Sequence, residues 1–165
     1  MNDFNKNEYK DSNLIGIIGN FDGMHIGHRK IINFMENYSK KFLNSKKIFI
    51  TFEPHTKLFF QNQKNFLILD QEEKKLFAEK FGFDIFLSIK FDSEFSKNSA
   101  EDFIEKILID KIGLNALFAG KNFCFGKGRV GNKDLFLESR YKEKINFFEV
   151  DLEKMDIVDV PQSQN

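Results

Sequence analysis

Several residue types are scarce in this chain of 165 residues, and each shortage excludes a class of protein. Cys124 is the only cysteine, so an internal disulfide and a cysteine-based metal cluster are both excluded. No apolar run approaches the roughly 18 residues that cross a membrane. The polar start of the chain also lacks the apolar segment of a signal peptide. We therefore expect a cytoplasmic protein that does not use a membrane as a partner.

An excess of charge of either sign is absent as well, because 25 acidic and 25 basic side chains balance. Binding to nucleic acid needs clustered positive charge, so the balance argues against a nucleic-acid partner. Apolar residues are plentiful at 41%, with 22 phenylalanines, which is enough to fill the core of one domain. We expect an N-terminal tail at 1–12 and one domain at 13–165, and the oligomeric state stays open.

The densest group of chemically suggestive residues runs from Gly19 to His28. The apolar run 14–18 before it is typical of a buried strand, and an amphipathic helix is predicted at about 27–43 after it. At the helix N-terminus, His25 and His28 would add ring N–H donors to the free backbone donors of the first turn. Glycines allow the backbone to approach an anion closely, so the group suits nucleotide phosphates. The alternative is an ordinary strand-to-helix turn with two incidental histidines.

Two further motifs follow predicted strands. Thr51-Phe52-Glu53-Pro54-His55 ends a strand predicted at 47–52, where Phe52 or Pro54 would offer a flat surface to a planar ring and His55 a polar contact. A plain strand end with a proline stop explains these residues equally well. The loop 120–133 follows a strand predicted at 114–119 and carries four cations and no acid, which favours an anionic ligand over a merely solvated loop.

The other predicted elements complete an alternating pattern of strands and helices. Helices are predicted at 70–81, from Ser99 to Gly113 and at about 132–141, and strands at 84–88 and 144–150. This order predicts an α/β domain whose five-stranded, mainly parallel sheet has helices on both faces. Ligands of such sheets bind beyond the carboxyl ends of the strands, where the strand order reverses. We therefore expect the three motifs to meet at one edge of the sheet.

Taken together, the three motifs resemble a known family. His25-Ile26-Gly27-His28 is similar to the H-x-G-H signature of the nucleotidyltransferase superfamily. With Thr51-Phe52-Glu53-Pro54-His55 and Gly120-x-Asn122-Phe123-x-Phe125-Gly126-x-Gly128-Arg129-x-Gly131, the chain resembles the adenylyltransferase module of the bacterial riboflavin kinase/FMN adenylyltransferase family over about residues 14–160. The resemblance implies a Rossmann-like nucleotidyltransferase fold of the HIGH superfamily. It also implies the transfer of AMP from ATP to FMN, with Mg²⁺, to give FAD and pyrophosphate.

The same resemblance implies roles for individual residues. His25 and His28 would be catalytic and would bind the phosphates of ATP. The ATP site would also include Gly19, Phe21, Gly23 and Gly27. The FMN site would include Asp22, Phe52, Pro54, His55, Asn122, Phe125 and Arg129. Asn122 would in addition lie near the magnesium ion, although many members of the family have Asp at this position.

Two features of the family are not found in these 165 residues. Its Ile-Ser-Ser-Thr-x-Ile-Arg stretch would follow a segment like Val158–Asn165, where this sequence stops, so we expect a shortened C-terminal end and weakened catalysis. The riboflavin kinase barrel is also missing, so we expect no riboflavin phosphorylation. Two alternatives to FAD synthesis stay open. One is a nucleotide- or flavin-binding remnant with little or no turnover, and the other is a nucleotidyltransferase for another phosphorylated acceptor.

Overall fold

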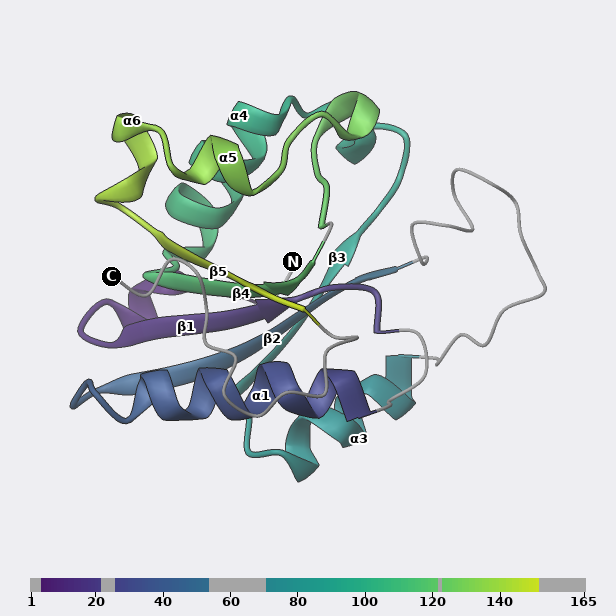
Figure 1. Cartoon of the computed structure of the whole chain (residues 1–165). Coiled ribbons are helices and arrows are strands. Elements are labelled where there is room, and N and C mark those ends of the chain that lie inside the picture. Colours follow the sequence, from purple (N-terminus) through teal and green to yellow (C-terminus); the bar gives the residue numbers. More distant parts are fainter. Residues whose placement is uncertain (1–3, 22–25, 54–70, 122, 152–165) are drawn as a thin grey trace.

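Five parallel strands form the centre of the molecule, in the spatial order β3-β2-β1-β4-β5 (Figure 1). The computed structural model describes residues 4–21, 26–53, 71–121 and 123–151, without the side chains of 26–28. The strands are β1 (Asn13–Ile18), β2 (Ser45–Glu53), β3 (Ile85–Lys90), β4 (Ala116–Gly120) and β5 (Asn146–Val150). All five were predicted within about two residues at either end, and the sheet is wholly rather than mainly parallel.

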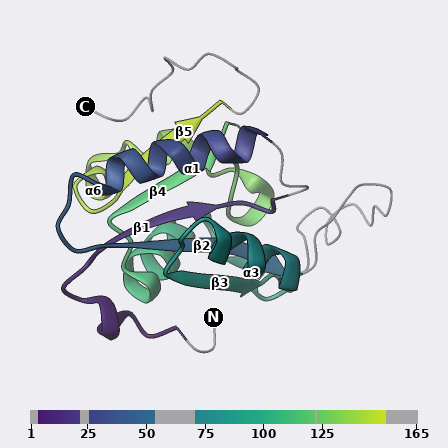
Figure 2. The same cartoon turned by 90° about the horizontal axis from the view of Figure 1, so that it is seen from below.

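Helices cover both faces of the sheet, as the sequence predicts (Figures 1 and 2). One face is covered by α1 (Ile26–Ser39) and α3 (Gln71–Lys80). The other face is covered by α4 (Ala100–Asp102), the π-helix η3 (Phe103–Ile112), α5 (Lys133–Phe136) and α6 (Ser139–Lys142). The described residues also form short 3₁₀ turns at η1 (Lys6–Tyr9), η2 (Phe95–Lys97) and η4 (Lys127–Arg129).

Two hydrophobic clusters hold these layers together, one on each face of the sheet. Ile15 and Ile17 of β1 pack with Ile31 and Met35 of α1, whereas Leu14 and the helix η3 belong to the opposite cluster. Successive strand residues point to opposite faces, so a strand that is covered on both sides must be apolar throughout. This explains why β1 and β2 read as continuous apolar runs in the sequence.

The strand order reverses beside β1. From β1 the chain runs outward through β2 to β3, and it then crosses back to β4 and continues to β5. In the register of the sheet, Ile18 lies between Ile50 of β2 and Ala119 of β4. The three strands that precede the sequence motifs are therefore neighbours, and their carboxyl ends meet at one edge, as predicted.

Two predicted helices end differently in the structure. Helix α1 ends at Ser39 rather than near residue 43. At this end, Ser39 Oγ donates a hydrogen bond to the carbonyl of Glu36 at 2.8 Å. The carbonyl of Ser39 in turn accepts a hydrogen bond from Ser45 Oγ at 2.8 Å. Side-chain bonds of this kind compete with the helical ladder and close it. Leu43 is left fully exposed beyond the helix.

The single helix predicted at 132–141 is wrong, because this segment forms α5 and α6 with a break between them. One continuous helix would place Leu137 and Tyr141 on the same side, four residues apart. In the structure Tyr141 is 1% exposed whereas Leu137 is 59% exposed, and only a break in the helix permits both. Burial, together with a 2.8 Å hydrogen bond to the Glu105 carboxylate, raises the pKa of Tyr141 to about 12.

The described part of the expected N-terminal tail, residues 4–12, is more ordered than the sequence predicts. It contains η1, and the Phe4 ring packs against the larger hydrophobic cluster and stacks on Tyr9 with the ring centres 5.8 Å apart. An aromatic anchor of this kind holds a segment that has little secondary structure of its own. The domain boundary at residue 13 stays a prediction.

Candidate functional site

The first motif begins where β1 leaves the sheet. The backbone N–H of Gly19 still donates a hydrogen bond to the carbonyl of Ile50, at 3.2 Å, so the turn starts while it is tied to β2. Phe21 then adopts a φ of 56°, a value that is uncommon for any residue other than glycine. Its ring is buried against Phe49, with the ring centres 4.3 Å apart. Phe21 therefore anchors the turn in the core, and does not offer its ring to a nucleotide as an open surface.

Helix α1 begins at Ile26, so His28 is the third residue of that helix. This places the second half of the H-x-G-H signature in the first helical turn, where backbone N–H groups are free to bind an anion. The strand before the motif and the helix after it are confirmed. The side chain of His28 lies outside the described residues, as do Asp22, Gly23, His25, Pro54, His55 and Asn122, so the roles of these residues stay predictions.

The second motif occupies the end of β2. Thr51 is fully buried, and its hydroxyl accepts a hydrogen bond from the ammonium group of Lys74 at 3.1 Å. The Phe52 ring is buried on the other face of the sheet and meets Phe91 edge to face, with the ring centres 5.7 Å apart. Phe52 therefore supports the motif from within the core, and the flat surface expected for a flavin ring is not exposed at this residue.

The third motif folds into a closed loop after β4. Phe125 and Gly131 form an antiparallel bridge, with N···O distances of 3.1 and 2.9 Å. A Cβ on Gly131 would lie 2.5 Å from the Phe125 ring, and a Cβ on Gly126 would lie 2.5 Å from the backbone of Ala100. Both positions exclude any side chain, since real Cβ atoms do not approach other atoms so closely. Gly126 and Gly131 thus serve the packing of this loop.

Arg129 stands at the tip of the loop with a φ of 56°. Phe21 and Arg129 are the two non-glycine residues with positive φ in the described part of the chain, and each belongs to a predicted binding motif. Backbone strain of this kind costs about 1–3 kcal/mol per residue and gathers at functional sites. The exposed Arg129 is well placed to meet an anion, whereas the Phe125 ring is buried beside Phe103, 5.2 Å between ring centres, and supports the loop.

The four cations of the loop are less equivalent than the sequence indicates. Lys121 lies 3.7 Å from the carboxylate of Asp151, and Lys133 lies 3.5 Å from that of Glu149. The loop itself has no acid, but Glu149 of β5 and Asp151 just after it lie beside the loop, which sequence reasoning missed. Half-exposed ion pairs of this kind contribute little to stability. Their effect is to reduce the positive charge that the two lysines present to an anionic ligand.

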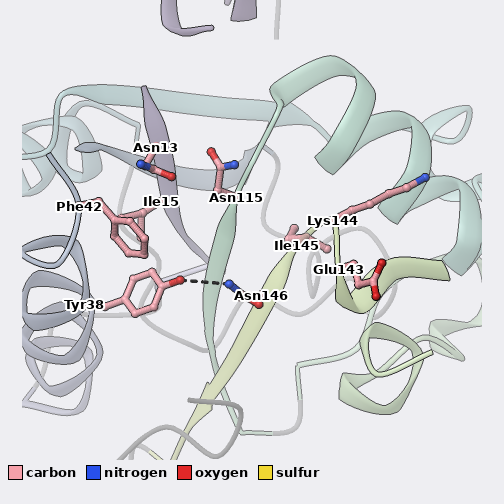
Figure 3. Close-up of a pocket in the computed structure, with 9 residues that line it drawn as sticks. All are labelled: Asn13, Ile15, Tyr38, Phe42, Asn115, Glu143, Lys144, Ile145 and Asn146. Carbon is pink, nitrogen blue, oxygen red and sulfur yellow. Dashed lines mark hydrogen bonds between the residues drawn. The ribbon is translucent and has the colours of Figure 1, made fainter. Parts of the chain in front are cut away.

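A hollow lies at the opposite edge of the sheet, away from all three motifs. It encloses about 160 Å³ and is lined by Asn13, Ile15, Tyr38, Phe42, Asn115, Glu143, Lys144, Ile145 and Asn146 (Figure 3). Asn13 and Asn146 begin β1 and β5, and Asn115 precedes β4, so the hollow sits at the amino ends of the strands. Within it Asn146 Nδ2 donates a hydrogen bond to the Tyr38 hydroxyl at 3.1 Å. The hollow is therefore separate from the edge where the motifs gather.

Sequence reasoning also missed Lys74, which is 1% exposed in α3. In the sequence it stands beside Lys75 and reads as part of a solvated helix surface. Lys74 is four residues before Ala78 and seven before Phe81, which places it on the apolar side of the helix. This spacing is the feature of the sequence from which its burial could have been predicted.

Neither a cluster of metal-binding side chains nor a membrane-spanning helix is found among the described residues. Residues 4–21, 26–53, 71–121 and 123–151 contain no group of three or more His, Cys, Asp or Glu side chains that could hold a metal ion. In the same part of the chain, no helix has the length and apolar character needed to cross a membrane.

The sequence of the chain matches the FAD synthetase family over residues 7–164. The chain belongs to the FAD synthetase family. Its wholly parallel sheet with helices on both faces is the nucleotidyltransferase-like Rossmann fold of that family.

Similar FAD synthetase relatives are bifunctional proteins. The chain is 36% identical over 140 residues to the bifunctional riboflavin kinase/FMN adenylyltransferase of Buchnera aphidicola from Schizaphis graminum, a match that covers 85% of this chain and 45% of the relative. It is 30% identical over 115 residues to the protein of the same name from Escherichia coli K12, which covers 70% of this chain and 37% of the relative. The chain thus spans less than half the length of these relatives.

A solved structure shares the fold of this FAD synthetase family member. The structure is described as a macrolide-efflux protein from Streptococcus pneumoniae, and it superposes with a TM-score of 0.68 at 22% sequence identity. The match covers 85% of this chain and 46% of that one. At this identity the likeness supports the α/β fold alone.

Proposed function

We propose that this chain is an FMN adenylyltransferase, which transfers AMP from ATP to FMN and forms FAD and pyrophosphate. One observation carries the proposal. The strands that lead into the three motifs, β2, β1 and β4, are adjacent and end at the edge where the strand order reverses. In open α/β sheets this is where ligands bind. Family membership and the names of the relatives supply the substrates.

The reaction needs little from the protein beyond alignment and charge. The second pKa of a phosphate monoester is about 6, so the FMN phosphate is a dianionic nucleophile near neutral pH and needs no general base. One of its oxygens bonds to the α-phosphorus of ATP. The bond from that phosphorus to the oxygen bridging to the β-phosphorus breaks, and pyrophosphate leaves with the electron pair. The protein must hold the two phosphates in line and stabilise the charge that passes to pyrophosphate.

The named residues divide this work between two loops. We assign His25, His28 and the N-terminus of α1 to the triphosphate, where donors and the helix dipole stabilise negative charge. Gly19, Gly23 and Gly27 let the backbone come close to the same phosphates. We assign Arg129 to the FMN phosphate, because a guanidinium forks onto phosphate oxygens. Asp22, Pro54, His55 and Asn122 would complete the flavin side, with buried Phe21, Phe52 and Phe125 as supports.

Magnesium belongs to the proposal as a companion of ATP. An ATP-using nucleotidyltransferase family makes a divalent metal plausible, and Mg²⁺ is commonly bound by substrate phosphates, waters and one or two protein ligands. The described residues hold no cluster of metal-binding side chains, and the candidate ligand Asn122 lies outside them. In this proposal the ion arrives on the triphosphate and supplies charge neutralisation there.

The test is product analysis with FMN, ATP and magnesium chloride. We expect FAD and pyrophosphate in equal amounts, measured by chromatography of the flavins and an enzymatic pyrophosphate assay. ATP binding without any flavin product would instead support the nucleotide-binding alternative. Pyrophosphate release with phosphopantetheine in place of FMN would support transfer to another phosphorylated acceptor. Either of these last results overturns the proposed function.

A further inference from the structure

The carboxyl end of β5 contacts both of the segments that carry the proposed phosphate sites. Asp151 is the first residue after this strand, and its side chain is 22% exposed. Its backbone carbonyl accepts a hydrogen bond from the ammonium group of Lys30 at 3.3 Å, and its carboxylate lies 3.7 Å from the ammonium group of Lys121. One residue thus links helix α1 to the entrance of the loop 120–133.

The bond to α1 reaches the part of the helix that carries the first motif. Lys30 is the fifth residue of α1 and follows His28 by two positions. The helix is also held by apolar contacts, since Ile31 and Met35 lie in the same hydrophobic cluster as Val150. The bond from Lys30 is therefore not needed to attach the helix to the sheet. It fixes where the first turns of the helix lie relative to the end of β5.

The loop is tied to the same place by two bonds at its entrance. Lys121 N–H donates a hydrogen bond to the carbonyl of Val150 at 2.9 Å, which closes the pairing of β4 with β5. The Lys121 side chain then meets the carboxylate of Asp151. This side chain is 56% exposed, and ion pairs of such exposed groups contribute little to stability. The pair therefore holds the loop entrance in place without being needed for folding.

We propose that Asp151 is a positioning residue for nucleotidyl transfer, which holds α1 and the loop 120–133 at the separation that aligns the FMN phosphate with the α-phosphorus of ATP. This inference rests on the proposed function, in which α1 binds the triphosphate and Arg129 of the loop binds the FMN phosphate. In-line attack is sensitive to distance, and a displacement of about 1 Å lowers the rate by about 100-fold. Asp151 thus acts on the rate of transfer without touching a substrate.

The experiment measures FAD formation from ATP and FMN with magnesium chloride and separates kcat from KM. In Asp151→Asn the carboxylate is lost, while the backbone carbonyl remains for Lys30. We expect kcat to fall about tenfold, as for a displacement of the loop by a fraction of an ångström. KM for ATP should stay within about twofold. KM for FMN should fall by no more than about threefold, because the Lys121 ammonium group is mostly exposed and screened by water and salt.

Two further changes at the same ion pair separate positioning from other roles. Asp151→Glu keeps a carboxylate within reach of Lys121, so it should retain at least about half of the parent kcat. Lys121→Met breaks the pair from the other side and should lower kcat about as much as Asp151→Asn does. Because the two substitutions remove one interaction, the double variant should lose no more than either single variant.

The matched control is Glu149→Gln on the same strand. Glu149 pairs with Lys133 at 3.5 Å, at the other end of the loop. Its neighbour Phe148 lies in the hydrophobic cluster under α1, so Glu149 faces the opposite side of the sheet, away from that helix. This variant loses an ion pair of the same kind but no link to α1. Its kcat should stay within about twofold of the parent value.

Three results would overturn the proposal. The first is an unchanged kcat in Asp151→Asn. The second is an equal loss of kcat in Glu149→Gln, which would show that any anchor of the loop has the same effect. The third is a loss of kcat/KM that comes wholly from a raised KM, which would show a role in binding. All variants should melt within about 4 °C of the parent chain, because exposed ion pairs add little stability. Failure of both Asp151→Asn and Lys121→Met to fold would also overturn the proposal.

Failure of the proposed function gives a different result. A parent chain that makes no FAD overturns the proposed function together with the inference that rests on it. A parent chain that makes FAD, with an Asp151→Asn variant of equal kcat, overturns the inference alone.

Discussion

The two edges of the sheet differ in how their polar groups are used. At the amino edge, Asn115 Oδ1 accepts a hydrogen bond from Leu14 N–H at 2.9 Å, and the Asn115 carbonyl accepts one from Asn146 N–H at 2.9 Å. At the carboxyl edge, Phe21 and Arg129 adopt positive φ angles, and Lys74 is buried just beneath. The amino edge has a hollow, yet the side chains of Asn115 and Asn146 there bond to Leu14 N–H and to the Tyr38 hydroxyl (Figure 3).

This difference teaches that a hollow alone is a poor guide to function in this fold. Hydrogen bonds that close on themselves stabilise the folded chain, since they leave few polar groups unsatisfied. Strained backbone does the opposite, because it lowers stability unless other contacts or a ligand compensate for it. We therefore expect substitutions at the carboxyl edge to change catalysis, and substitutions at the amino edge to change stability alone.

The largest effect is expected from His28→Ala in the first turn of α1. Removing one donor to the charge that develops in the transition state should lower turnover by about 100- to 1000-fold, or roughly 2.7–4 kcal/mol. Steady-state FAD formation measures this effect, while FMN affinity should change little. Near-normal turnover would contradict the assignment of His28.

A second large effect is expected from Gly131→Ala. The new Cβ would lie 2.5 Å from the Phe125 ring and 2.8 Å from the Ala100 Cβ, so the loop must deform. Overpacking of this kind lowers the free energy of unfolding by about 1–3 kcal/mol, and we expect FMN use to fall with it. Urea denaturation measures the first effect. In the control Gly128→Ala, the new Cβ meets no atom closer than 3.7 Å, which leaves only the strain of a φ of 69°. A Gly131 variant no less stable than this control would contradict the packing argument.

Arg129→Asn separates the charge of the loop from its backbone. Asparagine tolerates the left-handed conformation, so the free energy of unfolding should change by less than about 0.5 kcal/mol. Loss of a charged hydrogen bond to phosphate, worth about 1.5–3 kcal/mol, should raise KM for FMN by roughly 10- to 100-fold. KM for ATP should stay within twofold. An unchanged KM for FMN would remove Arg129 from the flavin site.

The smallest effect is expected at the amino edge, from Asn115→Ala. The variant leaves the Leu14 N–H without its partner, which should lower the free energy of unfolding by about 1 kcal/mol. Thermal and urea denaturation measure this loss, and kcat and KM should match those of the parent chain. A clear loss of turnover in this variant would contradict the claim that substitutions at the amino edge change stability alone.

The sequence predicts the scaffold better than the detail of the site. Continuous apolar runs identify β1 and β2, and Ser99 and Gly113 mark the ends of a helix through a cap and a φ of 80°. These signals are local and strong, so tertiary contacts do not override them. The π-helical form of η3 was not predicted, although its buried residues Ile107 and Ile112 lie five apart, wider than an α-helical stripe.

Other features depend on contacts between distant segments. The pairing of Lys121 with Asp151 and the burial of Lys74 against Thr51 arise only when β5 and α3 are in place. Phe52 and Phe125 look like surfaces for a flat ligand in the sequence, but the folded core buries both rings. An aromatic residue in a motif has the same appearance whether it contacts a ligand or supports the loop that does. Packing in the folded chain decides whether such a ring contacts the ligand or supports the loop, and a single sequence does not show this packing.

The claim that the carboxyl edge binds the substrates is tested most directly by mapping amide chemical shifts of the chain as ATP, FMN and magnesium chloride are added. We predict the largest changes at 19–21, 51–53 and 123–131, with those at the hollow residues 13–15, 115 and 143–146 within the spread of the rest of the chain. Changes concentrated at the hollow, with the carboxyl edge unaffected, would contradict the placement of the site.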